Sequence, residues 1–139
     1  MTMATTATTQ LELVTPEALL LCEGVGMVVI PGVEGDMGIM VDHAPTVSTL
    51  RPGVLSVHET ASSPANRRIF VGGGVVEVTN AHCIILAEEA ADLADLSKDQ
   101  AEARLAEAQA ALDTAASEGE KTQAKAELAI AQAQVAALL

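Results

Sequence analysis

The sequence predicts an α+β protein in which a β domain comes first and a pair of helices second. The composition changes sharply near residue 87. Residues 1–86 contain all five prolines, nine of the ten glycines and thirteen of the fourteen valines, a mixture typical of short strands joined by turns. Residues 87–139 contain nineteen alanines, one glycine and no proline, which favours helix. We therefore expect a β-sandwich or flattened barrel over residues 10–87 and an antiparallel two-helix hairpin over residues 88–139.

The first nine residues, MTMATTATT, are expected to form a disordered tail. They are rich in Thr and Ala and contain neither the basic stretch nor the apolar stretch of a secretory signal. The strands are therefore expected to begin near residue 10.

Short apolar or alternating runs in the β half predict eight or nine strands. The runs cover residues 11–14, 18–22, 25–30, 39–41, 46–50, 54–59, 68–71, 75–79 and 83–87. Between them, Gly, Pro, Asn and Ser predict turns at residues 31–32, 35–36, 52–53, 62–66 and 79–80. The three glycines at 72–74 are interpreted as a bulge or a close-packed turn. A phosphate-binding loop is excluded because no GxxxxGK[ST] motif is present and no lysine precedes Lys98.

Two helical segments flank the sequence Ser117-Glu118-Gly119. Ser97, followed by Gln100 three residues later, predicts an N-cap for the first helix. Each helix carries one apolar stripe, and the two stripes are Leu105, Ala108, Leu112 and Ala115, and Leu128, Ala131, Val135 and Leu138. We expect the helices to pair through Leu105, Leu112, Leu128 and Val135. The hairpin should be weakly held and free to dock elsewhere, because alanine buries little apolar area.

The charge and hydropathy of the chain exclude several classes of partner. Lys and Arg total 7 and Asp and Glu total 19, which gives a net charge of −12. Such an acidic chain is not expected to bind nucleic acid or an anionic lipid surface, because both require clustered cations. The longest apolar run, around residues 25–30, is too short to cross a bilayer. Any association with a membrane is therefore expected to go through another protein.

No constellation of side chains points to catalysis, a metal or a cofactor. His43, His58 and His82 lack a second ligand at metal spacing. No nucleophile-elbow motif is present. Glu88 and Glu89 are interpreted as a solvated junction between strand and helix rather than as paired catalytic carboxylates. We expect an interaction protein with no catalytic residue, no metal and no cofactor.

The two cysteines, Cys22 and Cys83, are far apart and lie in the apolar stretches LLLCEG and AHCIIL. Both are interpreted as buried, reduced thiols, and therefore as an indication of a reducing cytosol.

Three segments in this order carry a resemblance to a known family. They are LELVTPEALLLCEGV, then VIPGVEGDMGIMVDHAPTVSTLRPGVL, and then IFVGGGVVEVTNAHCIILAEEA. The second contains a P-G-x-x-G-[DE]-x-G-I turn followed by H-A-P and L-[KR]-P-G. With a helical hairpin behind them, these segments resemble the epsilon subunits of bacterial and chloroplast F-type ATP synthases over about residues 10–139.

The resemblance implies a ten-strand β-sandwich followed by a two-helix hairpin. It also implies a non-catalytic subunit at the foot of the central stalk, which couples rotation of the c-ring to the gamma subunit. The implied location is peripheral, on the cytoplasmic side of the cell inner membrane, with contact to the membrane only through the c-ring. In some members the hairpin also reaches the alpha and beta subunits and inhibits hydrolysis, or binds ATP.

Residue roles follow from the same resemblance. The turn formed by Val33, Glu34, Gly35 and Asp36 matches the loop that family members place against the c-ring. Asp36 occupies the acidic position, where its carboxylate accepts from c-ring cations or amides; alternatively, it is a solvated turn residue suited to the left-handed conformation.

His43 and Ser48 match positions that face gamma in the family, although His43 alternatively braces the turn before Pro45. Four glycines, at positions 32, 35, 38 and 53, are interpreted as sites of unusual φ or close backbone approach.

The first helix departs from the family at one place. Members that bind ATP carry [IL]-D-x-x-R-A there, whereas this chain has LSKDQA at residues 96–101. Ser97 replaces the aspartate and Gln100 replaces the arginine, and the second helix offers only Lys121 and Lys125. We therefore expect weak inhibition and weak or no ATP affinity; the alternative function is an ATP-sensing inhibitory regulator of the same complex.

Overall fold

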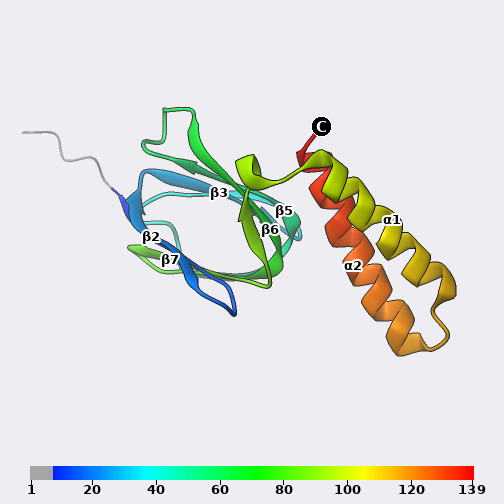
Figure 1. The fold of residues 1–139 in the computed structure, drawn as a ribbon. Coiled ribbons are helices and arrows are strands. Elements are labelled where there is room, and N and C mark those ends of the chain that lie inside the picture. The colour runs from blue at the N-terminus through cyan, green and yellow to red at the C-terminus, as the bar shows by residue number, and fades with distance from the viewer. Residues whose placement is uncertain (1–7) are drawn as a thin grey trace, which may run out of the picture.

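The computed structural model describes residues 8–139 and shows a β domain with a helical hairpin projecting from one side (Figure 1). The strands are β1 (Thr9–Val14), β2 (Leu19–Val25), β3 (Met27–Gly32), β4 (Gly35–Ile39), β5 (Thr46–His58), β6 (Ala65–Val78), β7 (His82–Ala87) and β8 (Ala90–Asp92). A 3₁₀ helix, η1 (Leu93–Asp95), leads to α1 (Lys98–Thr114) and α2 (Glu118–Ala137). The predicted α+β order, strands first and helices second, is confirmed.

The strands form one hydrogen-bonded sheet in the order β2-β1-β7-β6-β5-β3-β4, and β8 pairs with β6. The β1 and β7 pair is parallel, whereas the other pairs are antiparallel. β5 and β6 run beside each other from Thr46 opposite Val78 to His58 opposite Ala65. The first half of β6 lies beside β8 and its second half lies beside β7, so this strand joins two different neighbours.

The expectation of ten strands is wrong for the described residues, which form eight. The runs at 46–50 and 54–59 join into β5 across Pro52 and Gly53, and those at 68–71 and 75–79 join into β6 across the glycines. Gly73 and Gly74 have φ of 102° and 141°, values that let the strand bend without ending. A Cβ on Gly74 would also lie 2.1 Å from the Leu86 carbonyl oxygen. The structural interpretation of the glycine run is thereby confirmed.

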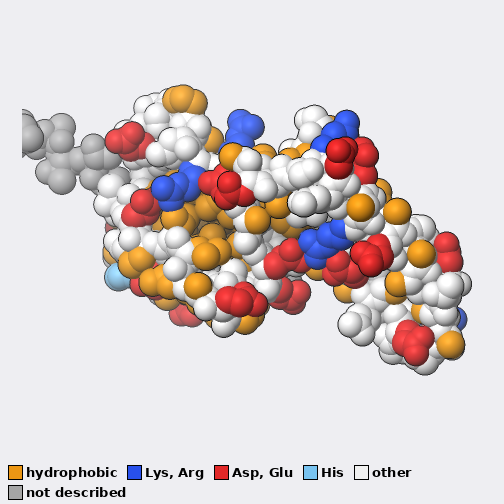
Figure 2. Space-filling model, viewed as in Figure 1, with side chains coloured by type: hydrophobic (Ala, Val, Ile, Leu, Met, Phe, Trp, Pro, Cys, Tyr) orange, Lys and Arg blue, Asp and Glu red, His pale blue; other side chains and the backbone are white. Residues whose placement is uncertain are grey.

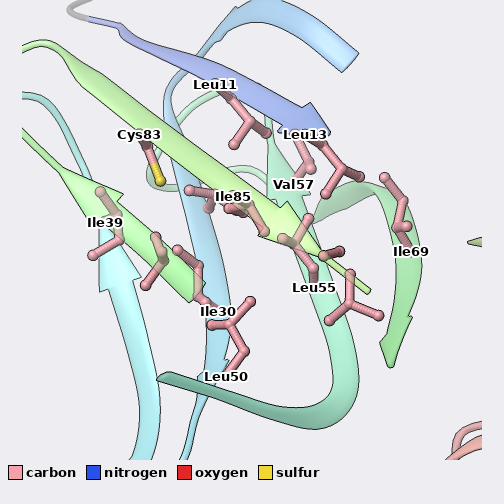
Figure 3. Close-up of a cluster of buried hydrophobic side chains, with 14 of the residues drawn as sticks. Leu11, Leu13, Ile30, Ile39, Leu50, Leu55, Val57, Ile69, Cys83 and Ile85 are labelled. Carbon is pink, nitrogen blue, oxygen red and sulfur yellow. The ribbon is translucent and has the colours of Figure 1, made fainter. Parts of the chain in front are cut away.

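The core of the β domain is aliphatic. Side chains from β1, β3, β4, β5, β6 and β7 point into one space (Figure 3). Those without exposed surface include Leu11, Leu13, Ile30, Ile39, Leu55 and Ile85. Burial alternates along β1, as the sequence pattern predicts for a strand with one face on the core.

The two cysteines differ, and the interpretation of both as buried is wrong. Cys83 is completely buried in the core, and this burial raises the pKa of its thiol to about 12. Cys22 is exposed, because its side chain lies on the outer face of β2, next to Gln10 and Glu12.

The β half continues beyond residue 87, where the sequence predicted its end. β8 pairs with β6, and Asp92 then caps η1 by accepting from the Ala94 amide at 2.9 Å. The first helix begins only at Lys98, after Ser97, whose hydroxyl accepts from the Gln100 amide at 3.4 Å. The predicted N-cap is therefore confirmed. Of the predicted tail at 1–9, residues 1–7 lie outside the described part, and Thr9 is a buried residue of β1.

The helices pair side by side and contact the β domain at one end only, with the turn between them at the far end (Figure 1). Most of the buried positions in the two helices are alanines: Ala101, Ala108, Ala124 and Ala131 are buried, together with Ile130 and Gln134. The four residues predicted to pair the helices, Leu105, Leu112, Leu128 and Val135, are half-buried. Toward the β domain, α2 packs on β5 and β6. Within residues 8–139, no helix is long and apolar enough to span a bilayer.

Candidate functional site

The turn between β3 and β4 forms an exposed tip. Val33 and Glu34 occupy the tip, and the side chain of Val33 is more than half exposed. The strands close directly behind them, where Gly32 pairs with Gly35. Gly35 has a φ of 135°, and a Cβ on Gly32 would lie 2.8 Å from the Gly35 carbonyl oxygen. Both positions therefore require glycine.

Arg51 of β5 fixes this tip from behind. One guanidinium nitrogen donates to the Gly32 carbonyl and another pairs with the Asp36 carboxylate, each at 2.5 Å. The Val33 amide also donates to the Thr49 carbonyl at 3.0 Å. The tip is thus held to β5 on both sides of the turn, and the Asp36 charge is already paired within the chain.

The structure distinguishes the two carboxylates of the turn. Asp36 does not adopt the left-handed conformation suggested for it; within residues 8–139, Asp42 is the only non-glycine residue with positive φ. Glu34 is exposed and forms no ion pair with any described residue. Glu34, rather than Asp36, therefore presents an uncompensated negative charge at the tip.

His43 and Ser48 lie in and after the turn that follows β4. The His43 ring donates from Nδ1 to the Ala44 carbonyl at 2.8 Å, which favours the interpretation of this histidine as a brace for the turn before Pro45. Ser48 is directly opposite buried Val76, so it lies on the core side of β5 and is half-buried. Its neighbour Val47 lies on the outer side, with 73% of its surface exposed.

Val47 belongs to an exposed apolar patch that sequence reasoning missed. Val75 of β6 and Leu86 of β7 are paired and are 42% and 54% exposed, and Val14 of β1 lies opposite Leu86. We call Val14, Val47, Val75 and Leu86 the outer patch. The alternation in these strands contains its signal, because the outward positions of β6 and β7 would ordinarily be polar. Val14, Leu86 and Val75 are direct neighbours across β1, β7 and β6, whereas Val47 of β5 lies opposite Glu77. Exposed apolar side chains gathered on one sheet face are typical of a protein interface.

Where the hairpin meets the β domain, Arg104 of α1 binds two carboxylates. Its Nη atoms bond both oxygens of Glu89 at 2.6 and 2.9 Å, and its Nε bonds Glu127 of α2 at 2.6 Å. These bonds hold the pKa of Arg104 above its usual range. Figure 2 shows basic and acidic side chains meeting at this junction. Glu89 is therefore not the simple solvated junction residue expected from the sequence, which gives no sign of pairing between residues this far apart.

Within the described residues, no three His, Cys, Asp or Glu side chains gather as metal ligands.

Comparisons with known proteins agree with this picture. The family model for the β-sandwich domain of the ATP synthase delta/epsilon chain matches residues 8–92. The ATP synthase epsilon chain of Rhodospirillum rubrum is 52% identical over 130 residues, which cover 94% of this chain and 96% of that protein. The one from Paramagnetospirillum magneticum is 42% identical over 129 residues, or 93% and 96% of the two chains.

Solved structures are similar as well. A chain of the Euglena gracilis mitochondrial ATP synthase, in a structure of OSCP, F1 and the c-ring, superposes with a TM-score of 0.79 at 27% identity. The match covers 96% of this chain and 82% of that one. A chain from the central stalk and c-ring of the Tetrahymena thermophila enzyme shares the fold, with a TM-score of 0.71, 19% identity and coverage of 94% and 96%.

Proposed function

This chain belongs to the family of ATP synthase delta/epsilon chains, as an epsilon chain and a non-catalytic subunit, and we propose that it joins the gamma subunit to the c-ring in the rotor. The observation that carries the proposal is the outer patch. A chain with this much apolar surface exposed on one sheet face has an interface that another protein is built to cover. The coupling role then consists of holding two partners rigidly together, which needs no chemistry.

We assign the outer patch to gamma. Val47, Val75 and Leu86 offer apolar area from strands that are hydrogen-bonded to a neighbouring strand, so binding them requires little reordering of this chain. His43, one of the two gamma-facing residues implied by the resemblance, belongs to the turn before Val47, and we place it at the rim of this interface. Ser48, the other, follows Val47 in β5, but its side chain lies on the core side, so we assign it no direct contact with gamma.

We assign the tip, comprising Val33, Glu34, Gly35 and Asp36, to the c-ring. The Arg51 bonds to Gly32 and Asp36 order the turn before binding, which lowers the entropic cost of association. Glu34 provides the carboxylate that accepts from c-ring cations or amides, and Val33 provides apolar contact. Through this contact the chain is held peripherally at the cytoplasmic side of the cell inner membrane.

We assign the hairpin, which would reach the alpha and beta subunits in an extended state, no more than a weak regulatory role. Ser97 uses its hydroxyl to cap α1, and Gln100 carries no charge. On α2, Lys121 is paired with Glu118 at 3.6 Å, and Lys125 forms no ion pair with any residue from 8 to 139. Such a helix offers little attraction to acidic groups on the catalytic subunits.

The test for the gamma interface uses charged substitutions. Val47→Glu and Leu86→Glu should each weaken binding to purified gamma by about tenfold or more, because a carboxylate would be buried in an apolar interface. Ala126→Glu, which adds the same charge on an exposed face of α2, is the matched control and should bind like the wild type. Binding of both patch variants at wild-type affinity would refute the assignment.

The test for the c-ring contact is separate. Glu34→Lys and Arg51→Gln should reduce the amount of catalytic head retained on membranes, the first by reversing charge and the second by loosening the tip. Glu107→Lys on the hairpin is the control for the charge reversal. Retention that matches the wild type in both tip variants would contradict the placement of this turn.

A further inference from the structure

We infer that Arg104 is a three-way clasp whose bonds to Glu89 and Glu127 determine whether the hairpin stays docked on the β domain. A single guanidinium joins the β7–β8 turn, α1 and α2. The bonds to Glu89 hold the hairpin to the β domain, and the bond to Glu127 holds the two helices together. This inference rests on the contacts in the chain itself and does not depend on the proposed partners.

The β domain presents Glu89 from a fixed position. The Glu89 carbonyl accepts from the Gly72 amide at 2.9 Å, and the Glu88 amide donates to the Gly73 carbonyl at 3.0 Å. A Cβ on Gly72 would lie 2.4 Å from Cγ of Glu89, so the glycine leaves the space that the Glu89 side chain fills. The bend in β6 therefore also positions the Glu89 side chain that Arg104 binds.

The apolar contact under the hairpin is small. Phe70, the only aromatic residue of the sequence, is fully buried but does not belong to the core cluster that contains its neighbours Ile69 and Val71. The helix α2 contacts β5 and β6, the strand that carries Phe70. From α2, Ile130 and Gln134 are buried. The rest of the hairpin projects away from the β domain (Figure 1) and adds nothing to docking.

The negative charge of both the β domain and the hairpin makes docking of the hairpin depend on Arg104. Residues 8–92 carry three cationic and eleven acidic side chains, and residues 98–137 carry four and seven, so both bodies are negatively charged. Without the guanidinium, Glu89 and Glu127 would face each other across the junction as like charges. Loss of Arg104 thus replaces an attraction with a repulsion, and neutralising one carboxylate should relieve that repulsion.

The test measures the position of the hairpin in the full-length chain. Spin labels on exposed Cys22 and on Cys introduced by Ser117→Cys report the distance between β2 and the far turn of the hairpin, while Cys83 is buried and remains unlabelled. The wild type should give one narrow distance distribution. Arg104→Gln should raise the ratio of displaced to docked hairpin by about tenfold. Lys121→Gln, which breaks a pair within α2 alone, is the control and should leave the distribution unchanged.

The double variant Arg104→Gln with Glu89→Gln distinguishes a clasp from ordinary packing. It should be more docked than Arg104→Gln alone, because the like-charge contact is removed. A narrow wild-type distribution in Arg104→Gln, or a double variant no more docked than the single one, would overturn the inference. If circular dichroism shows that Arg104→Gln loses helix content, the single variant Glu89→Gln replaces it in the test, because it keeps the bond between Arg104 and Glu127 that joins the two helices. A displaced, fully helical hairpin in Glu89→Gln supports the inference. A docked hairpin in this variant overturns it.

Discussion

Arg51 and Arg104 show how this chain uses its few cations. Each binds oxygens from two other segments: Arg51 holds the β3–β4 tip, and Arg104 holds the hairpin junction. Four of the seven Lys and Arg side chains are in ion pairs within the described residues. Two of these cations, Arg51 and Arg104, thus connect separate segments of the chain, and the acidic side chains outnumber the cationic ones by 19 to 7.

Glycines at the tip are not equivalent, although the sequence suggested a backbone role for both Gly35 and Gly38. Gly38 has no positive φ, and a Cβ there would meet only the Met27 sulfur at 3.8 Å, so that expectation is wrong. Gly35→Ala should lower the free energy of unfolding by about 1–3 kcal/mol, because φ is 135°. Gly38→Ala, the matched control, should change it by less than about 0.5 kcal/mol. Urea unfolding of both variants measures the difference, and equal costs would contradict the assignment.

Burial of Cys83 predicts a pH dependence with a definite sign. Its pKa is raised from 9.0 to about 12 in the folded state, so between these values the unfolded chain loses the thiol proton and the folded chain keeps it. The folded state binds more protons, and its stability therefore falls as pH rises above 9, by about 1.4 kcal/mol per pH unit from this group. Urea unfolding at pH 8 and pH 10.5 should show the fall in the wild type and a smaller fall in Cys83→Val. The absence of tyrosine keeps the background titration low.

At the scale of elements, the hairpin depends on small residues. Ala131 of α2 has no exposed surface and Ala108 of α1 has 3% of its surface exposed, so the two helices pack closely at these small side chains. The leucines and the valine of the two stripes are only half-buried. Ala108 and Ala131 belong to the stripes that the sequence predicts, together with the half-buried leucines and the valine. A contact between alanines brings the helices close together but buries little apolar area, so it contributes little free energy of stabilisation.

Overpacking this contact should destabilise the hairpin without affecting the β domain. Ala131→Leu inserts three extra carbon atoms into a closed space and should cost about 1–3 kcal/mol. Ala126→Leu, on an exposed position of the same helix, should leave helix stability nearly unchanged. Thermal melting followed at the helical circular dichroism band makes the comparison. Equal melting of the two variants would show that the helices are not closely packed at Ala131.

At the scale of the whole molecule, we propose different roles for the β domain and the hairpin. The tip and the outer patch both belong to the β domain, whereas the hairpin contributes a docked but projecting arm. The boundary matters for separating them: a chain ending after residue 96 keeps β8 and η1, while one ending at residue 87 loses the strand that pairs with Ile69–Val71 of β6.

A chain of residues 1–96 should fold and still assemble with gamma. Because α2 carries few unpaired cations, removing the hairpin should raise the ATPase rate of the purified complex less than twofold. Phe70→Ser in the shortened chain serves as a control for solubility, because Phe70 is buried outside the core cluster of the β domain. Activation of tenfold or more would show that the hairpin is a strong inhibitor, and failure to assemble would show that it takes part in binding gamma.

Local signals in the sequence were sufficient to predict the order of the elements. The same order was implied by the resemblance to the family. The composition break, the alternation along β1 and the cap at Ser97 act over a few residues, so they can be interpreted without knowing the fold. The tip was located in the same way, because its glycines lie within four residues of each other.

Tertiary structure alone decided what depends on residues far apart in the chain. The strand count changed because β5 and β6 bend instead of ending, and a bend and a turn give the same Gly and Pro signal. The outer patch forms only when the register aligns Val75 with Leu86, and the clasp forms only when folding brings Glu89 and Glu127 to Arg104, 15 and 23 residues away. Which residues pair across such distances depends on how the whole chain packs, and this cannot be inferred from a pattern of neighbouring residues.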